Sequence, residues 1–357
     1  MLKAFDLFSG CGGFRLGCQK AGFEIAGFCE IDKYAVKLYN AYFSTADEVY
    51  YNDATQIISR NLPDFGLLTA GFPCQPFSLA GKRRGFSDTR GTLFFDVLRI
   101  LHDKQPLYFI LENVKGLLVD DNRNTFKIII ESLTELGYYT VEWALLNSKY
   151  FGVPQNRERI FIVGYPRRYG IGKIFPLAKS TGHFNKTTDE SGQRVSSAIT
   201  TKVDRTESTY IVESGTLRTH KDNRGFRKMS DNISPCLNAR AREDGSGQTV
   251  VSIPVLTPER SNKRQNGRRF KDNEEDMFTI TAQDRHGVFN GKRIRRLTPL
   301  ECFRLQGFPD DIVKTAYDIG ISDAQLYKMA GNSVTISVVY EIAKKIMELH
   351  KEFNSEV

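Results

Sequence analysis

The chain has 357 residues, six cysteines and a formal net charge of +8. No run of about 18 apolar residues is present and the first residues do not resemble a secretory signal, which argues against a membrane protein and favours a cytoplasmic one. The cysteines form no C-x-x-C pair, so neither a metal site nor a disulfide framework is expected.

The residues before position 166 alternate apolar strands with amphipathic helices. This order predicts a doubly wound, mainly parallel sheet. Apolar residues at positions 338, 339, 342, 346 and 349 mark one face of a closing helix. Strands are expected at 2–8, 23–30, 48–53, 65–70 and 107–112, and a turn followed by a strand at 152–165. Helices are expected after the first glycine turn and at 32–42, 92–101 and 126–136.

The stretch D-L-F-S-G-C-G-G-F (6–14) places three glycines directly after the first strand. Such a turn lets the backbone approach a ligand, although its spacing is not the G-x-G-x-x-G of dinucleotide sites. Glu30 at the tip of the second strand suits a ribose diol, or is a solvated strand end. Asp53 could accept a hydrogen bond from an adenine amine, or cap the following helical stretch.

The stretch G-F-P-C-Q-P-F-S (71–78) holds Cys74 between two prolines, just past the end of a buried strand. A lone cysteine more often packs in a core. Here the stiff turn at the carboxyl end of the sheet, where ligands bind in open α/β folds, favours a nucleophile.

Two further stretches are expected at the same edge of the sheet. Glu112 ends a buried strand in E-N-V-K-G, where a solvated carboxylate is the alternative. In Q-N-R-E-R (155–159), strand alternation would place Gln155, Arg157 and Arg159 on one face and Glu158 on the other. Arginines that enter a buried strand need anionic or carbonyl partners, unless the edge is exposed.

A thiol, a carboxylic acid and an arginine beside a nucleoside pocket suit methylation of cytosine at C5. A thiolate can add to C6 if a carboxylic acid of raised pKa, here Glu112, protonates N3. An arginine at O2 would stabilise the charge that develops on the ring. Because the target atom is stacked in a duplex, the base must be flipped out.

The chain resembles the DNA (cytosine-5)-methyltransferases of bacterial restriction–modification systems. The family's motifs occur in its order: D-L-F-S-G-C-G-G-F, G-F-P-C-Q-P-F-S, R-G-T-L-F-F-D, E-N-V-K-G, Q-N-R-E-R, R-R-L-T-P-L-E-C-F-R-L-Q-G-F-P and G-N-S-V. The resemblance implies that Cys74 is the nucleophile, that Glu112 contacts N3 and N4, and that Arg159 contacts O2 with support from Arg157. It also implies a class I S-adenosylmethionine-dependent methyltransferase fold, a Rossmann-like sheet.

The resemblance further implies an S-adenosylmethionine pocket, with S-adenosylhomocysteine as product. Ile31 departs from the family, in which many members place an aromatic residue against the adenine. The residues expected to line the pocket are Phe8, Gly10, Gly12, Gly13, Glu30, Ile31, Asp53, Ala54, Pro73, Leu93, Asn332 and Ser333.

The positive charge is concentrated in one internal segment. Residues 167–296 hold 26 Lys and Arg against 15 Asp and Glu, a net of +11, whereas the rest holds 24 against 27, a net of −3. This segment loses the strand–helix pattern and is rich in Gly, Asn, Ser, Thr and Arg. A solvated surface is the simpler interpretation, but the concentration of positive charge in one segment favours a polyanionic partner.

The resemblance assigns this segment to target recognition. A catalytic domain is expected at 1–166, a smaller, mostly irregular or β recognition domain at 167–324, and a helix returning to the catalytic domain at 325–357. Residues 75–92 would form a loop that closes over the flipped base and binds phosphates. The residues expected to contact DNA are Gln75, Ser78, Lys82, Arg83, Arg84, Arg240, Arg242 and Arg285.

The partners implied are double-stranded DNA and a cognate restriction endonuclease, with the protein as a monomer. Three stretches could read bases, 216–219, 236–242 and 278–287, and the sequence does not choose among them. A tRNA cytosine-5 methyltransferase on the same motifs is the nearest alternative. A DNA-binding protein with an inactive site conflicts with the intact Cys74, Glu112 and Arg159, and a nicotinamide dehydrogenase conflicts with the glycine spacing.

Overall fold

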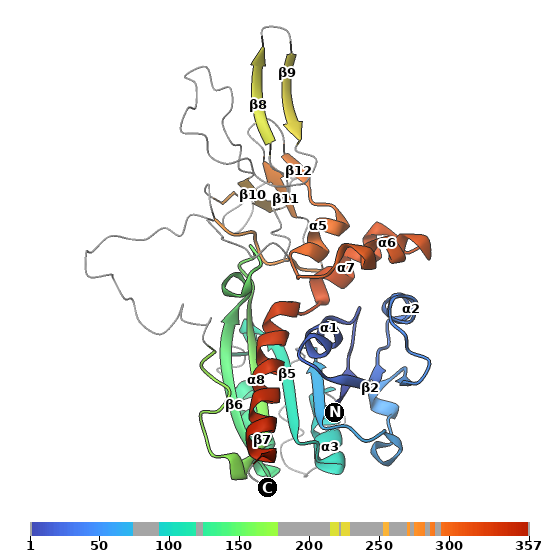
Figure 1. The fold of residues 1–357 in the computed structure, drawn as a ribbon, viewed down its shortest axis with the longest axis vertical. Helices are drawn as coiled ribbons and strands as arrows, with labels where there is room; N and C mark the ends of the chain where they lie inside the picture. Colours follow the sequence, from blue (N-terminus) through green and yellow to red (C-terminus); the bar gives the residue numbers. More distant parts are fainter. Residues whose placement is uncertain are drawn as a thin grey trace, which may run out of the picture.

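The computed structural model describes residues 2–73, 93–118, 124–177, 215–220, 223–228, 253–256, 270–271, 275–282, 286–289 and 294–355. Its largest element is a seven-stranded sheet of order β3-β2-β1-β4-β5-β7-β6 (Figure 1). Strands β1 to β5 pair in parallel, and β7 runs antiparallel to both its neighbours. The strands are β1 (Lys3–Leu7), β2 (Glu24–Cys29), β3 (Val49–Tyr51), β4 (Leu67–Gly71), β5 (Tyr108–Val114), β6 (Tyr139–Asn147) and β7 (Glu158–Pro166).

The doubly wound, mainly parallel sheet expected from the sequence is confirmed. Strand β6 is not among the expected strands, because it lies at the sheet edge and most of its residues are only partly buried, which weakens the apolar pattern. In the described residues, short 3₁₀ helices connect the main elements: η1 (Ala54–Gln56), η2 (Ser59–Asn61), η4 (Lys115–Leu118), η6 (Ser148–Phe151) and η7 (Arg167–Tyr169).

Helices cover both faces of the sheet, and the alternation of side chains along each strand builds two cores. Phe5 packs in the core under α3 (Leu93–Lys104) and α4 (Asn124–Glu135), whereas Ala4 packs in the core under α1 (Gly13–Lys20) and α8 (Ile336–Asn354). Helices α1 and α8 touch closely, because a Cβ on Gly17 would lie 2.6 Å from Cγ1 of Val339. The closing helix expected from the sequence is α8.

A third core joins the carboxyl end of the sheet to a group of helices above it (Figure 1). It contains Leu38 of α2 (Lys33–Tyr42) and Phe303 of α5 (Pro299–Arg304). Helix α5 begins with a capping box between Thr298 and Glu301, as its S/T-x-x-E spacing dictates. The group is completed by α6 (Asp310–Asp318) and α7 (Asp323–Asn332), so α7 spans the domain boundary expected at residue 325.

Parts of the middle segment form two small sheets, and the two-stranded one lies at the far end of the molecule from the seven-stranded sheet (Figure 1). The hairpin β8 (Gly215–His220) and β9 (Asn223–Lys228) contains T-L-R-T (216–219), which is therefore strand rather than loop. The second sheet holds β10 (Ile253–Leu256), β11 (His286–Phe289) and β12 (Ile294–Arg296). Residues 236–242 lie outside the described residues. Among the described helices, none is long and apolar enough to cross a membrane.

Candidate active site

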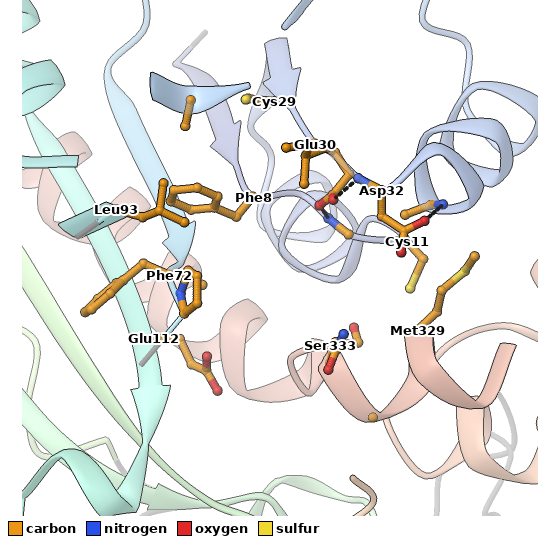
Figure 2. A pocket seen from close by; sticks show the side chains of 18 of the residues that line it. Phe8, Cys11, Cys29, Glu30, Asp32, Phe72, Leu93, Glu112, Met329 and Ser333 are labelled. Carbon is orange, nitrogen blue, oxygen red and sulfur yellow. Dashed lines mark hydrogen bonds between the residues drawn. The ribbon is translucent and has the colours of Figure 1, made fainter. Parts of the chain in front are cut away.

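A cavity of about 420 Å³ opens at the carboxyl end of the sheet, between the strand tips and α7 (Figure 2). Small-molecule sites usually fall in the range of about 300–1,000 Å³. Figure 2 shows Glu30 and Glu112 standing well apart across this cavity. Ten of the twelve residues expected to hold a cofactor line it: Phe8, Gly10, Glu30, Ile31, Asp53, Ala54, Pro73, Leu93, Asn332 and Ser333.

The glycine turn after β1 shapes one wall of the cavity. Gly10 and Gly12 adopt left-handed backbone angles, with φ of 54° and 91°. The two expected residues that do not line the cavity, Gly12 and Gly13, lie behind the wall. A Cβ on Gly12 would lie 2.4 Å from the ring of Phe43, and one on Gly13 would lie 2.6 Å from Oγ of Ser333. These glycines allow close packing, and their contact with a cofactor stays a prediction.

Glu30 is fixed in place by two backbone amides. Its Oε2 accepts a hydrogen bond from the Gly10 amide at 2.8 Å, and its Oε1 accepts one from the Asp32 amide at 2.7 Å. The carboxylate is therefore an ordered wall of the cavity rather than a solvated strand end. Each oxygen keeps capacity for a second donor, such as a hydroxyl of a ligand.

The capping interpretation of Asp53 is confirmed, and its contact with an adenine amine stays a prediction. The residue lines the cavity, and its Oδ1 accepts hydrogen bonds from the amide and hydroxyl of Thr55, which caps η1. The cap fixes the carboxylate at the cavity rim. Ile31 also lines the cavity and is 68% exposed, so a ligand that covered it would bury apolar surface.

Glu30→Gln is expected to weaken binding of S-adenosylhomocysteine by about 10- to 100-fold, because the neutral amide loses the hydrogen bond from a ligand hydroxyl to a charged carboxylate, worth about 1.5–3 kcal/mol. Glu24→Gln, at the exposed start of the same strand β2, is the matched control. Isothermal titration calorimetry measures both. Equal affinities of the two variants would remove Glu30 from the binding site.

Glu112 and Arg159 form an ion pair at the other side of the cavity. Glu112 lies opposite Gly71 in the pairing of β5 with β4, and its Oε1 is 3.0 Å from Nε of Arg159. Both residues line the cavity. The neighbouring Asn113 is buried and donates from Nδ2 to the carbonyl of Phe72 at 3.0 Å, which holds the chain where it leaves β4.

The pKa of Glu112 is raised above its ordinary value, because burial disfavours the charged form more than the nearby Arg159 and Arg157 favour it. A raised pKa keeps a larger fraction of this carboxyl protonated near neutral pH. The group can therefore serve as a hydrogen-bond or proton donor to a ligand in the cavity.

The stretch 155–159 differs from the expected alternation, since β7 begins only at Glu158. Gln155 and Arg157 precede the strand and are fully buried by other contacts, while Glu158 pairs with Lys115 at 2.8 Å. The expectation that both arginines find anionic or carbonyl partners is confirmed. Arg159 pairs with Glu112, and Arg157 donates to backbone carbonyls.

The expected nucleophile, Cys74, lies outside the described residues. It directly follows Pro73, which lines the cavity. The other expected residues outside the described ones are Gln75, Ser78, Lys82, Arg83, Arg84, Arg240, Arg242 and Arg285.

Some cavity residues carry no recognisable signal in the sequence. Lys328 of α7 pairs with Asp32 at 2.6 Å and ties α7 to α2 at the rim, a contact between positions too distant for pattern analysis. Cys11 and Cys29 also line the cavity, and burial raises the pKa of each thiol to about 12. These two thiols stay protonated at neutral pH and are poor nucleophiles.

The family model for C-5 cytosine-specific DNA methylases matches residues 2–348. The chain is 37% identical to the orphan methyltransferase M.SPRI of Bacillus phage SPR, over 99% of each protein. It is 40% identical to the type II methyltransferase M.HpaII of Haemophilus parainfluenzae, over 96% of this chain and 88% of that protein.

Among solved structures, the S. pombe Dnmt2 methyltransferase superposes with a TM-score of 0.59 at 16% identity, over 99% of this chain and 100% of that one. That likeness concerns the fold, which is the class I methyltransferase fold expected from the sequence. The match of the family model over nearly all residues and the high identity to full-length relatives carry the assignment. The chain belongs to the C-5 cytosine-specific DNA methylase family.

Proposed function

We propose that this protein transfers a methyl group from S-adenosylmethionine to C5 of a flipped-out cytosine in a specific double-stranded DNA sequence. The observation that carries the proposal is the buried Glu112–Arg159 pair in the same cavity as Glu30 and the glycine turn. A proton donor and a fixed cation thus share one enclosed space with a nucleoside-binding wall.

The residues present fit the methyl donor. Gly10 has no atom within 4 Å of where a Cβ would stand, so its backbone faces open space beside the Glu30 carboxylate. Glu30 would accept from the ribose hydroxyls, and Asp53, with Ile31 beside it, would hold the adenine. Asn332 and Ser333 would contact the amino-acid end. When bound, the donor supplies a sulfonium methyl that the activated C5 accepts, and it leaves as S-adenosylhomocysteine.

The chain's own residues activate the cytosine. Cys74, as thiolate, forms a bond to C6 while Glu112 delivers a proton to N3. The π electrons of the C5=C6 bond thereby become available at C5. Arg159 stabilises the charge that develops at O2. After methylation, the C5 proton leaves to solvent, the Cys74–C6 bond breaks and the double bond re-forms, so that the thiolate and the N3 proton return to their starting states.

Base flipping is part of the proposal and agrees with the burial of the residues proposed to contact the base. Glu112 and Asn113 are buried and both line the cavity, so a base would have to enter the cavity to contact them. The basic middle segment, with its net charge of +11, would hold the phosphates of the DNA. The residues 75–92 would close over the flipped base.

The biological role we propose is protection of host DNA from a cognate restriction endonuclease. The name of M.HpaII refers to a type II system, whereas M.SPRI is named an orphan. Protection is preferred because the motifs resemble those of restriction–modification enzymes. A cognate endonuclease should digest DNA from cells that lack this protein and spare DNA from cells that express it.

Expression in a host without 5-methylcytosine tests the proposal directly. Sequencing of the host DNA should show 5-methylcytosine at one sequence, and purified protein with labelled donor should label duplex DNA but not tRNA. Label in tRNA alone would favour the tRNA alternative. Label in neither, from a folded protein that binds DNA, would favour the inactive DNA-binding alternative.

The recognition role of the middle segment gives a separate prediction. If residues 167–294 are replaced by the corresponding segment of M.HpaII, the chimera is expected to methylate the sequence that M.HpaII methylates. Base contacts determine the sequence that is recognised, and no described residue of 167–294 is among those that line the cavity. Sequencing of 5-methylcytosine in host DNA gives the result. A chimera that still methylated the original sequence would place recognition elsewhere in the chain.

A further inference from the structure

Arg157 is buried where three distant parts of the chain meet. Its Nη1 donates to the carbonyl of Ile280 at 2.7 Å, and its Nη2 donates to the carbonyls of Ser333 at 2.6 Å and Gly331 at 3.2 Å. The residue is only 2% exposed. Gly331 and Ser333 line the donor cavity, whereas Ile280 belongs to the middle segment. One guanidinium therefore joins the cavity wall to the segment proposed to read DNA.

Residues 277–282, which we call the anchor segment, are fastened to the stretch before β7. The Met277 amide donates to the Pro154 carbonyl at 2.9 Å, and the Asn156 amide donates to the Met277 carbonyl at 2.8 Å. Oε1 of Gln155 accepts from the Ile280 amide at 2.9 Å. The anchor segment then leads, through residues outside the described ones, to β11 of the small sheet. Its position thus connects that sheet with the catalytic stretch.

The anchor segment also presses against the end of α7. A Cβ on Gly331 would lie 2.2 Å from the Ala282 nitrogen and 2.3 Å from the Thr281 carbonyl carbon, so only glycine allows this approach. No residue of the anchor segment is among those that line the donor cavity. A shift of the anchor segment can therefore reach the cavity through Gly331, Ser333 and Arg157, all of which line it.

The side chain of Arg157 suits this connection. All three acceptors are backbone carbonyls, so the guanidinium responds to the position of the backbone rather than to side-chain identity. Burial and the nearby Arg159 lower the pKa of Arg157 to about 9, which shows that the charge is poorly solvated there. The folded protein is strongly destabilised when a buried charge loses a partner, so the guanidinium holds the three carbonyls together.

We propose that Arg157 is a positioning residue that couples the anchor segment to the donor cavity, so that donor binding and DNA binding strengthen each other. The inference rests on the proposed function. Because coupling is reciprocal, DNA should tighten donor binding by the factor by which the donor tightens DNA binding, and such factors are typically about 5- to 150-fold.

The first test is the dissociation constant of S-adenosylhomocysteine, measured with and without a duplex carrying the methylated sequence found in host DNA. DNA should lower this constant for the wild-type protein, and the ratio should fall toward one in Arg157→Lys, because an ammonium cannot span the same three carbonyls. Arg99→Lys is the matched control. Arg99 also donates to carbonyls, those of Ile57 and Ala54, but none belongs to the anchor segment, so the wild-type ratio should persist.

The second test needs no DNA. Hydrogen–deuterium exchange should show that S-adenosylhomocysteine slows exchange of the Met277 and Ile280 amides in the wild-type protein but not in Arg157→Lys. Should Arg157→Lys fail to fold, as judged by circular dichroism, Gly331→Ala displaces the anchor segment with Arg157 intact and should also reduce the ratio. A ratio of dissociation constants that falls toward one in the variant that folds supports the coupling.

A wild-type protein that methylates DNA but shows a ratio of one would overturn the inference and leave the proposed function standing. The same conclusion follows if the folded variant keeps the wild-type ratio and the wild-type exchange pattern. Failure of the wild-type protein to methylate any DNA would instead overturn the proposed function.

Discussion

Cys74→Ser is expected to abolish methyl transfer while DNA binding stays within a few-fold of the wild-type value. A hydroxyl is a far weaker nucleophile than a thiolate at neutral pH, so addition to C6 fails, with the loss of several orders of magnitude typical when an enzyme loses its nucleophile. Methyl transfer is measured with labelled S-adenosylmethionine, and DNA binding by fluorescence anisotropy.

A duplex containing 5-fluorocytosine sharpens this test. Fluorine at C5 cannot leave as a proton does, so in the presence of S-adenosylmethionine the methylated adduct of the wild-type protein cannot release Cys74 and should be visible by denaturing electrophoresis. Cys302→Ala removes a buried thiol in α5 that does not line the cavity, and this control should still form the adduct. A variant lacking Cys74 that formed the adduct would show that another group attacks the ring.

Glu112→Gln is expected to slow methyl transfer by about 10²- to 10⁴-fold, the range for loss of a general acid. The amide can still accept a hydrogen bond from Nε of Arg159, so the local geometry should survive. Because burial raises the pKa of Glu112, the wild-type carboxyl stays protonated to a higher pH than an exposed one and loses its proton above that pKa. The amide of the Glu112→Gln variant does not ionise in this pH range.

The ratio of wild-type to Glu112→Gln rates should therefore be largest at low pH and should decline as pH rises through the pKa of Glu112. Taking the ratio cancels the ionisation of Cys74, which both proteins share. Glu158→Gln, on the adjacent strand and paired with Lys115, should show a ratio that does not change with pH. A pH-independent ratio for Glu112→Gln would mean that its carboxyl does not donate a proton.

The parts of the fold that follow from local pattern could be predicted from the sequence. Buried parallel strands are nearly continuous apolar runs, so β1, β2, β4 and β5 were expected to within a few residues. Strand β6 was not, because its half-exposed residues resemble a loop. The stretch T-L-R-T is expected from the sequence as a base-reading loop but pairs with β9, since pairing depends on a partner that the local pattern does not show.

The candidate site could likewise be predicted only where it follows from local pattern. Glu30 and Glu112 were expected at the cavity because a strand end marks the edge of a parallel sheet. The Lys328–Asp32 pair and the three carbonyls around Arg157 were not foreseen in detail, because they join residues far apart in sequence. The expected shared face of Gln155 and Arg159 was wrong, since β7 begins only at Glu158 and Gln155 turns toward Leu305 and Ile280.

Asn332 and Ser333, which form one wall of the cavity, lie near the carboxyl end of the chain, just before α8, the helix that packs on α1. During translation the sheet strands and the basic middle segment emerge first, and residues 336–354 follow much later. A nascent chain would thus be able to meet DNA before it could hold a methyl donor. The order of synthesis itself would keep an unfinished polypeptide from modifying the genome.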